Sequence, residues 1–173
     1  MSETSDPLSR LATMGLALPP YEPPAEAMMA PYNKTGNRLL VGGLAPFIME
    51  GMEIPRLGAD ANVDLSKLNI DDLSEDHPLK KAFLGARLAT LRALSVAAHA
   101  AGDDLNKVSG CVRAHLSLRT GPNFERLGFL TLPVVRIMNS LFGQPPAMGV
   151  IGATALPMGV PMLLETEFVL HDD

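Results

Sequence analysis

The sequence predicts one α+β domain in which two helices cover one face of a mixed sheet. Three observations support this fold class. Apolar residues recur at helical spacing in residues 78–101 and 132–142, they alternate with polar residues at strand spacing in residues 107–119, and the 173 residues suffice for one domain with its own core. We expect residues 1–15 to form a flexible N-terminus and residues 16–173 to form the domain.

The first part of this domain is predicted to supply an arm and two strands. Residues 17–31 contain five prolines, which favour an extended arm on the surface. The turn signature Thr-Gly-Asn at 35–37 leads into an apolar strand at 38–46, where two glycines at 42–43 indicate a packing bulge more readily than a ligand contact. Residues 47–75 have no clear period and are expected to be loop with one helical turn.

Both helices are delimited by residues that favour helix ends. Before the first helix, Asp76 or His77 is a suitable N-cap, and Gly102 supplies the stop. The second helix is predicted at residues 132–142, with Thr131 as its N-cap and a glycine directly after it. The two helices and five strands follow the order strand-strand-helix-strand-helix-strand-strand.

The strand at 107–119 is predicted to have one apolar and one polar face. Alternation places Val112 and Ala114 on the apolar face, and Cys111, Arg113 and His115 on the polar face. The apolar face is expected to pack under the helices. The polar face must then meet water, a ligand or a partner subunit, and we expect copies of the same chain to cover it.

The C-terminal part is apolar but does not predict a membrane span. No charged residue occurs between residues 136 and 165, yet the prolines and glycines there exclude a continuous helix of about 20 residues. We expect two buried strands at 147–155 and 162–170, joined by a turn at 156–159. No membrane association is expected.

Composition and charge exclude several classes of function. The chain has 14 Lys+Arg against 19 Asp+Glu, a net charge of −5, no Trp and only 5% aromatic residues, which is unlike a nucleic-acid-binding protein. The only cysteine, Cys111, excludes an internal disulfide and is interpreted as a buried structural thiol. A polar, acidic N-terminus is not a signal peptide, so we expect a cytoplasmic protein. No histidine pair has metal-site spacing, and no metal is expected.

Four ionisable residues are the candidates for chemistry. Arg113 and His115 share one face of their strand, and Glu165 and Glu167 share one face of the last strand. The structural interpretation, which we favour, is a salt-bridge network between subunits. The functional interpretation makes Arg113 an anion clamp and His115 an acid or base near neutral pH, with Glu165 as the third catalytic candidate.

Several strings resemble the RidA (YjgF-like) family in their order and spacing. They are TGNRLLVGGLAP at 35–46, ARLATLRALSVAAHAAGDDLNKV at 86–108, FGQPPAMGVIGATALP at 142–157 and ETEFVL at 165–170, and the resemblance covers residues 14–170. It implies the chorismate-mutase-like fold and a homotrimer. It also implies an enamine or imine deaminase site between subunits, which uses an arginine for the substrate carboxylate and no metal or organic cofactor.

The resemblance fails at that arginine. The string Pro-Ala-Met at 146–148 has methionine in its place, and Gly-Gly-Leu at 42–44 stands where the family usually has Ser-Gly-Gln. A thioether does not bind a carboxylate. By resemblance, the ligand-binding positions are Gly43, Leu44, Met148, Gly149 and Glu167.

The function expected from this resemblance is therefore non-standard. We expect a homotrimer of unassigned reaction, similar to a longer subgroup of the family, that binds or converts a small molecule in clefts between subunits. The alternative is an active deaminase of the 2-iminobutanoate/2-iminopropanoate type in which Arg113 or another arginine replaces the missing one. Ribonuclease action, a label of some relatives, is disfavoured by the acidic charge.

Overall fold

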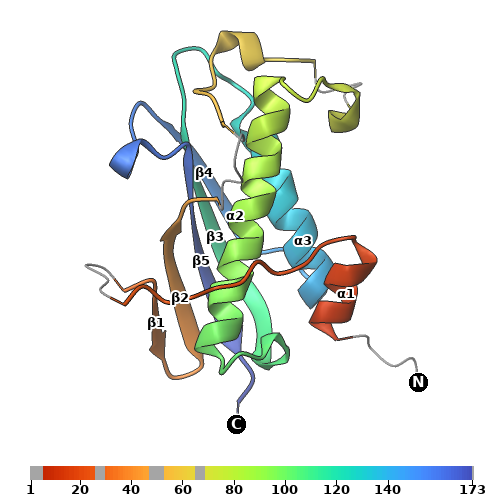
Figure 1. Cartoon of the computed structure of the whole chain (residues 1–173), viewed down its shortest axis with the longest axis vertical. Coiled ribbons are helices and arrows are strands. Elements are labelled where there is room, and N and C mark those ends of the chain that lie inside the picture. Colours follow the sequence, from red (N-terminus) through yellow and green to blue (C-terminus); the bar gives the residue numbers. More distant parts are fainter. Residues whose placement is uncertain (1–5, 26–29, 47–52, 65–68, 173) are drawn as a thin grey trace.

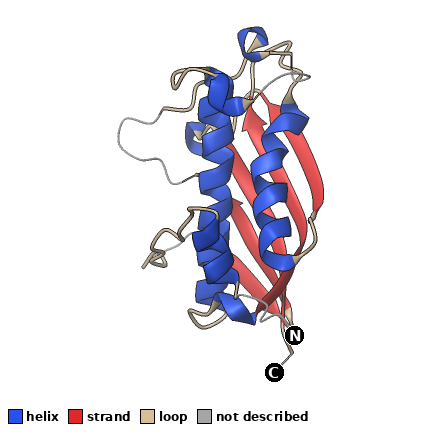
Figure 2. Ribbon diagram, turned by 90° about the vertical axis from the view of Figure 1, so that its right-hand side faces the viewer, coloured by secondary structure: helices blue, strands red, loops and turns tan. Residues whose placement is uncertain are grey.

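The computed structural model describes residues 6–25, 30–46, 53–64 and 69–172. Five strands form one sheet in the order β1-β2-β5-β3-β4, in which only β3 and β4 run parallel. The helices lie on one side of this sheet, as Figure 2 shows. The predicted α+β class, with its helices on a single face, is confirmed.

After an additional N-terminal helix, the helices and strands follow the predicted order along the chain (Figure 1). They are α1 (Pro7–Thr13), β1 (Tyr32–Thr35), β2 (Arg38–Leu44), α2 (Pro78–Ala100), β3 (Val108–Arg119), α3 (Leu132–Phe142), β4 (Ala147–Ala153) and β5 (Met162–Leu170). Short 3-10 turns η1 (Ala59–Ala61), η2 (Ile70–Asp72), η3 (Leu105–Lys107), η4 (Leu127–Thr131) and η5 (Pro157–Gly159) occur in the connections. Two parts of the predicted 47–75 loop, at 47–52 and 65–68, lie outside the described residues.

Helix α2 is the centre of the hydrophobic core. His77 caps it as predicted, because its Nδ1 accepts a hydrogen bond from the Leu79 amide at 3.2 Å. Gly102 follows the helix at a φ of +82°, a conformation that favours glycine over residues with a Cβ. The alanine-rich surface of α2 allows close packing, and the core includes Leu79, Phe83 and Leu94.

The N-terminus differs from the flexible segment predicted for residues 1–15. Within its described part, Asp6 caps α1 by accepting a hydrogen bond from the Ser9 amide at 3.0 Å. Leu11 is buried in the core, and Arg10 Nη1 donates to the Leu141 carbonyl of α3 at 2.6 Å. These contacts with a residue far along the chain hold α1, which explains why the local sequence did not indicate it.

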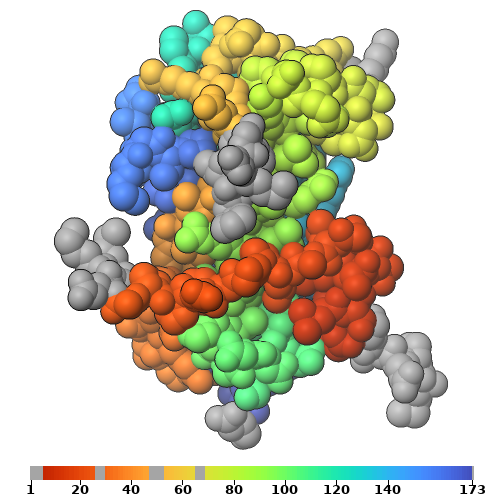
Figure 3. Space-filling model, in the orientation of Figure 1, coloured from red at the N-terminus to blue at the C-terminus, as the bar shows by residue number. Residues whose placement is uncertain are grey.

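The proline-rich arm crosses α2 on the outside of the molecule. In Figure 3 it is the orange-red band that runs over the helix. Ser95 Oγ on α2 donates to the Pro19 carbonyl at 2.7 Å, and Leu18 and Tyr21 pack against the core. The extended arm predicted at 17–31 is therefore found in its described part, while residues 26–29 lie outside the described residues.

Strand β5 does not pair with β4. The sequence predicted two buried strands joined by a turn, but β5 lies between β2 and β3, and β4 is an edge strand whose residues are partly or largely exposed. The two strands and the connection between them are found, but β4 is not buried, because the β3–α3–β4 segment forms a parallel crossover that places β4 outside β3. Strand β4 also ends at Ala153 rather than at residue 155.

A bulge changes the faces predicted for the first half of β3. The pairing with β5 shifts between Cys111 and Arg113, so two consecutive residues occupy the place of one. Cys111 consequently faces the core, whereas Val112 is 40% exposed. Both had been assigned to the opposite face. From Ala114 onward the predicted alternation holds, and Leu116 is buried.

Among the described residues, no helix is both long and apolar enough to cross a membrane.

Candidate functional site

The candidate site lies on the bare face, which is the face of the sheet opposite α2 and α3. Register places Arg113 of β3 directly beside Glu167 of β5, and His115 beside Glu165. The four predicted residues therefore come together in a shallow hollow of about 320 Å³. Leu40 of β2 also lines the hollow. Each of these side chains reaches the bare face because residues two apart on a strand point the same way.

Arg38 is a site residue that the sequence analysis missed. It lies at the start of β2 and pairs with Glu167, with Arg38 Nε 2.6 Å from Glu167 Oε1. Glu167 is the more buried partner, at 15% exposure of its side chain against 63% for Arg38. The sequence shows only that an arginine lies at the start of a strand. Its contact with Glu167 can be inferred only once β2 is known to pair with β5.

The remaining charged groups of the hollow have no partner among the described residues. The side chains of Arg113, His115 and Glu165 form no hydrogen bond or ion pair there. Glu167, which faces Arg113 across the strands, is already engaged by Arg38. The hollow thus offers one cation, one anion and one imidazole to a ligand or to another chain.

Gly149 of the edge strand β4 makes room for the imidazole of His115. The two residues are register partners, and a Cβ on Gly149 would lie 2.7 Å from His115 Nδ1. Such an approach is closer than real Cβ atoms tolerate. Gly149 is therefore a neighbour of His115 through packing rather than through a polar contact.

Gly43 also lies at the site, whereas two other predicted ligand positions do not. A Cβ on Gly43 would lie 3.8 Å from Glu165 Cγ, which places this glycine on the bare face. Leu44 instead pairs with Leu164 and is buried in the core, because the β2 register shifts between Val41 and Leu44. Leu44, which the sequence analysis placed among the ligand-binding positions, therefore does not line the hollow within one chain.

Met148 is also directed away from the hollow. It pairs with the buried Ala114 and packs against the hydrophobic core. Neighbouring residues on a strand point to opposite faces, so Met148 and Gly149 cannot both face the bare side. The position that carries methionine in place of the family's arginine is thus separated from Arg113 and His115 by the sheet within one chain.

Cys111 lies beneath the site and does not belong to it. Burial raises the pKa of its thiol to about 12, and the thiol donates a weak hydrogen bond to the Arg113 carbonyl at 3.4 Å. It is therefore protonated at neutral pH, as expected for a structural thiol. Among the described residues, no three His, Cys, Asp or Glu side chains come together in a way that suits a metal ion.

Comparison with known proteins identifies the fold. No protein-family model matches the sequence, and no curated protein matches it. A solved structure named a putative endoribonuclease, from Shewanella oneidensis, has a TM-score of 0.73 at 18% identity and covers 96% of this chain and 100% of its own. The protein Atu1372 of unknown function, from Agrobacterium tumefaciens, has a TM-score of 0.69 at 19% identity over 96% and 94%.

A structure that carries the RidA name is also similar. RidA from an Antarctic Psychrobacter has a TM-score of 0.50 at 22% identity and covers 86% of this chain and 93% of its own. The chain therefore has the fold of the RidA and YjgF structures, as the resemblance implied. At this level of identity, the similarity concerns the fold.

Proposed function

We propose that this chain, which has the RidA fold, is a divergent RidA-like protein that forms a homotrimer and binds or converts a small molecule in clefts between its subunits. The observation that carries the proposal is the bare face with its hollow, where Arg113, His115 and Glu165 have no partner among the described residues of one chain. Ionisable groups gathered in this way favour either a ligand or a second chain.

Exposed apolar residues on the same face support the assembly. Leu40, Val112 and Ile151 come from three strands and are 50%, 40% and 48% exposed. Sheets with helices on one side commonly keep polar residues on the other side when that side meets water. A face that mixes large apolar side chains with unpaired charges instead suits a surface that other copies of the chain cover.

The structure also bears on the salt-bridge network predicted between subunits. One ion pair, Arg38–Glu167, forms within a single chain. Arg113 and Glu165 are still available for contacts with a partner or a ligand. A structural role for Glu167 and a binding role for Arg113 are therefore compatible.

The alternative function is deamination of an enamine or imine substrate. Its support is the free guanidinium of Arg113, which has the geometry for two parallel hydrogen bonds to a carboxylate. His115, two residues away on the same face, would move a proton. No metal or organic cofactor is required in this proposal, and the attacking group would be water. Ribonuclease action, the activity in the name of one structural neighbour, is less compatible with 19 acidic against 14 basic residues.

An ammonia-release assay with 2-aminoacrylate generated in situ distinguishes the proposed non-standard role from the alternative deaminase. Deaminase action predicts release by the wild type and a loss of roughly 100-fold or more in kcat/KM for Arg113→Ala, since a charge-assisted contact to the substrate is removed. Arg136→Ala is the matched control, because Arg136 is an exposed arginine of α3 on the helix side. Absence of activity in the wild type would reject the alternative and leave the binding role.

A further inference from the structure

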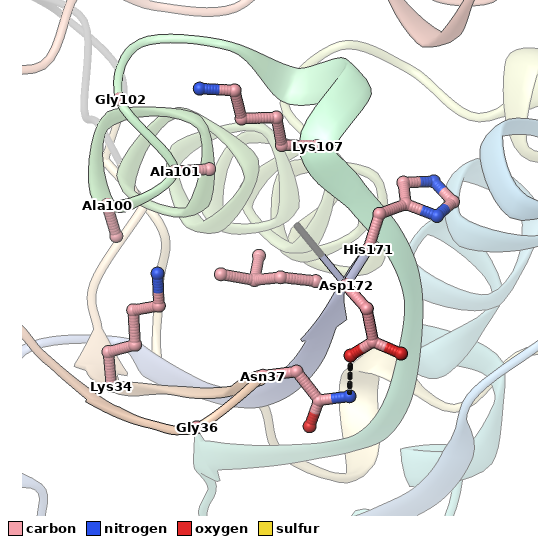
Figure 4. A pocket seen from close by; sticks show the side chains of 10 residues that line it. Lys34, Gly36, Asn37, Ala100, Ala101, Gly102, Lys107, His171 and Asp172 are labelled. Carbon is pink, nitrogen blue, oxygen red and sulfur yellow. Dashed lines mark hydrogen bonds between the residues drawn. The ribbon is translucent and has the colours of Figure 1, made fainter.

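Two features of the structure lie away from the bare-face site. One is a hollow of about 530 Å³ at the end of the sheet, where Lys34 and Lys107 lie on opposite sides of the end of α2 (Figure 4). Asp172, which also lines this hollow, accepts a hydrogen bond from Asn37 Nδ2 at 3.3 Å. The hollow therefore combines both signs of charge and favours no single class of ligand. The other feature is the connection between β4 and β5, which has a methionine at its tip.

This methionine, Met158, is the most exposed large apolar residue of the part of the chain that the structure describes. Its relative exposure is 95%, against 38% for Met14 and 0% for Met138 and Met162. Met148, the fifth methionine of the described residues, is partly buried against the core. In Figure 1 the connection that carries Met158 is the blue turn that projects to the left of β4. The thioether of Met158 is therefore far more open to small solutes than that of any other described methionine.

The backbone of the connection holds Met158 in this exposed position. Met158 has a φ of +53°, a left-handed conformation that is unfavourable for a residue with a Cβ and persists only where its surroundings impose it. The Gly159 amide donates to the Leu156 carbonyl at 3.0 Å, and Arg119 Nη1 donates to the Gly159 carbonyl at 2.7 Å. The Arg119 amide also donates to the Pro161 carbonyl at 2.8 Å. These hydrogen bonds attach the connection to β3, so the exposure of Met158 is part of the fold.

The thiol of the chain does not compete with Met158 for an oxidant. Cys111 is the only cysteine of the sequence, and it is 1% exposed. Burial raises the pKa of its thiol to about 12, so the thiol stays protonated at neutral pH. Peroxides react with the thiolate form of cysteine and with accessible sulfur. An oxidant in solution therefore meets the thioether of Met158 before it meets Cys111.

We propose that Met158 is a reversible oxidation site, which hydrogen peroxide converts to methionine sulfoxide before the other methionines of the described residues. A lone pair of the sulfur attacks one peroxide oxygen, and the S–O bond forms as the O–O bond breaks. The proton of the sulfur-bound hydroxyl passes to the departing hydroxide, which leaves as water, so that the sulfur loses two electrons to the peroxide. A methionine sulfoxide reductase reverses the change, because two thiols supply two electrons and two protons, the oxygen leaves as water and the thiols form a disulfide. The proposal is independent of the bare-face site.

Oxidation at this position changes the surface of the protein and leaves its core intact. Residues 154–161 contain no charged side chain, so the sulfoxide introduces a strongly polar group into an uncharged connection. Oxidation of Met138 or Met162 would instead place a polar oxygen in the core, where it would have to be desolvated. The chain oxidised at Met158 alone should therefore keep the free energy of unfolding of the unmodified chain.

Peptide mapping by mass spectrometry, with samples of the full chain taken during exposure to dilute hydrogen peroxide, tests the site. We expect Met158 to gain one oxygen roughly tenfold faster than Met138 and Met162, and faster than Met14, because oxidation follows exposure. In urea all five of these methionines should react at similar rates, since the fold no longer shields any of them. Methionine sulfoxide reductases for both sulfoxide epimers, added with dithiothreitol, should then remove the oxygen from Met158 in the folded chain.

Two leucine variants serve as controls. Met14→Leu removes the next most exposed methionine and should leave the oxidation rate of Met158 unchanged. Met158→Leu lacks the sulfur, so any effect of peroxide on its urea denaturation reports on the other methionines. Oxidation of Met158 no faster than that of Met14 or Met138 would overturn the site, because the connection would then be covered in solution. A sulfoxide at Met158 that the reductases cannot remove from the folded chain would overturn its reversibility.

Discussion

At Glu167, two arginines are available to one carboxylate. Arg113 lies directly across from it on β3, yet the ion pair forms with Arg38 of β2. Glu167 is thereby engaged by Arg38, and the Arg113 guanidinium has no partner among the described residues, as the proposed binding of an anion requires. Arg38 acts in this view as a positioning residue for the bare-face site, since it affects the ligand only through Glu167.

A double-variant comparison tests this role of Arg38. In Arg38→Ala, Glu167 is free to pair with Arg113, and binding of a carboxylate probe such as pyruvate should weaken by about two- to fivefold. Adding Glu167→Gln to that variant should restore the affinity, because the competing charge is then absent. Isothermal titration calorimetry measures both, and an Arg38→Ala affinity that Glu167→Gln leaves unchanged would contradict the competition.

The buried thiol of Cys111 should be protected from chemical modification in the folded protein. Its pKa is raised to about 12 by burial, so the folded protein should resist alkylation by iodoacetamide at pH 8 and react fully once unfolded in urea. Because the folded state retains the thiol proton more strongly, this group should also make stability fall as the pH rises from its ordinary pKa of 9.0 toward 12. Mass spectrometry of the alkylated chain is the measurement. Rapid labelling without denaturant would contradict the burial.

Among the elements, edge strand β4 depends on glycine where it passes the larger side chains of β3. Gly149 lies beside His115, and Gly152 lies beside Thr120, where a Cβ would be 2.6 Å from Thr120 Oγ1. The two glycines make room for the side chain of His115 on β3 and for that of Thr120, which directly follows β3. The glycines of β4 are therefore explained by close packing against these two side chains.

Gly149→Ala should displace the His115 ring and reduce the free energy of unfolding by about 1–3 kcal/mol through overpacking. Urea denaturation followed by circular dichroism measures the change, and the NMR shift of the imidazole reports on its displacement. Gly128→Ala is the matched control, because no atom lies within 4 Å of its would-be Cβ and its backbone is not in the left-handed region. Equal free energies of unfolding for the two variants would show that the His115 ring moves aside without destabilising the fold.

For the whole molecule, one face of the sheet is covered by helices and the other is bare. Within one chain, α2 and α3 bury one face, while the other combines the site residues with the exposed Leu40, Val112 and Ile151. The proposed trimer follows from this asymmetry, because the apolar residues on the bare face gain free energy when another copy covers them. Assembly and the site would then share one surface.

The assembly is tested by size-exclusion chromatography with light scattering. We expect a mass of about three chains rather than the 18.4 kDa of one chain. Leu40→Glu combined with Ile151→Glu should yield monomers, since carboxylates would be forced into an apolar interface. Leu8→Glu is the control, because Leu8 is also exposed but lies on α1, which is on the helix side. A wild-type mass of one chain would reject the trimer.

Local sequence determined the elements whose formation depends on near neighbours. The bounds of α3 and β5, the cap and stop of α2 and the turn before β2 follow from the His77 cap, from glycines and prolines, and from periodicity within a few residues, although Thr131 makes no capping hydrogen bond at the start of α3. The spacing of two also placed Arg113 and His115 on one face of their strand, and Glu165 and Glu167 on one face of theirs. Only the tertiary structure decided the strand order, the bulge that turns Cys111 inward, the contact of Arg38 with Glu167, and the core positions of Leu44 and Met148. These features depend on register between segments far apart in the chain, and one extra residue in a strand reverses the face of its neighbours.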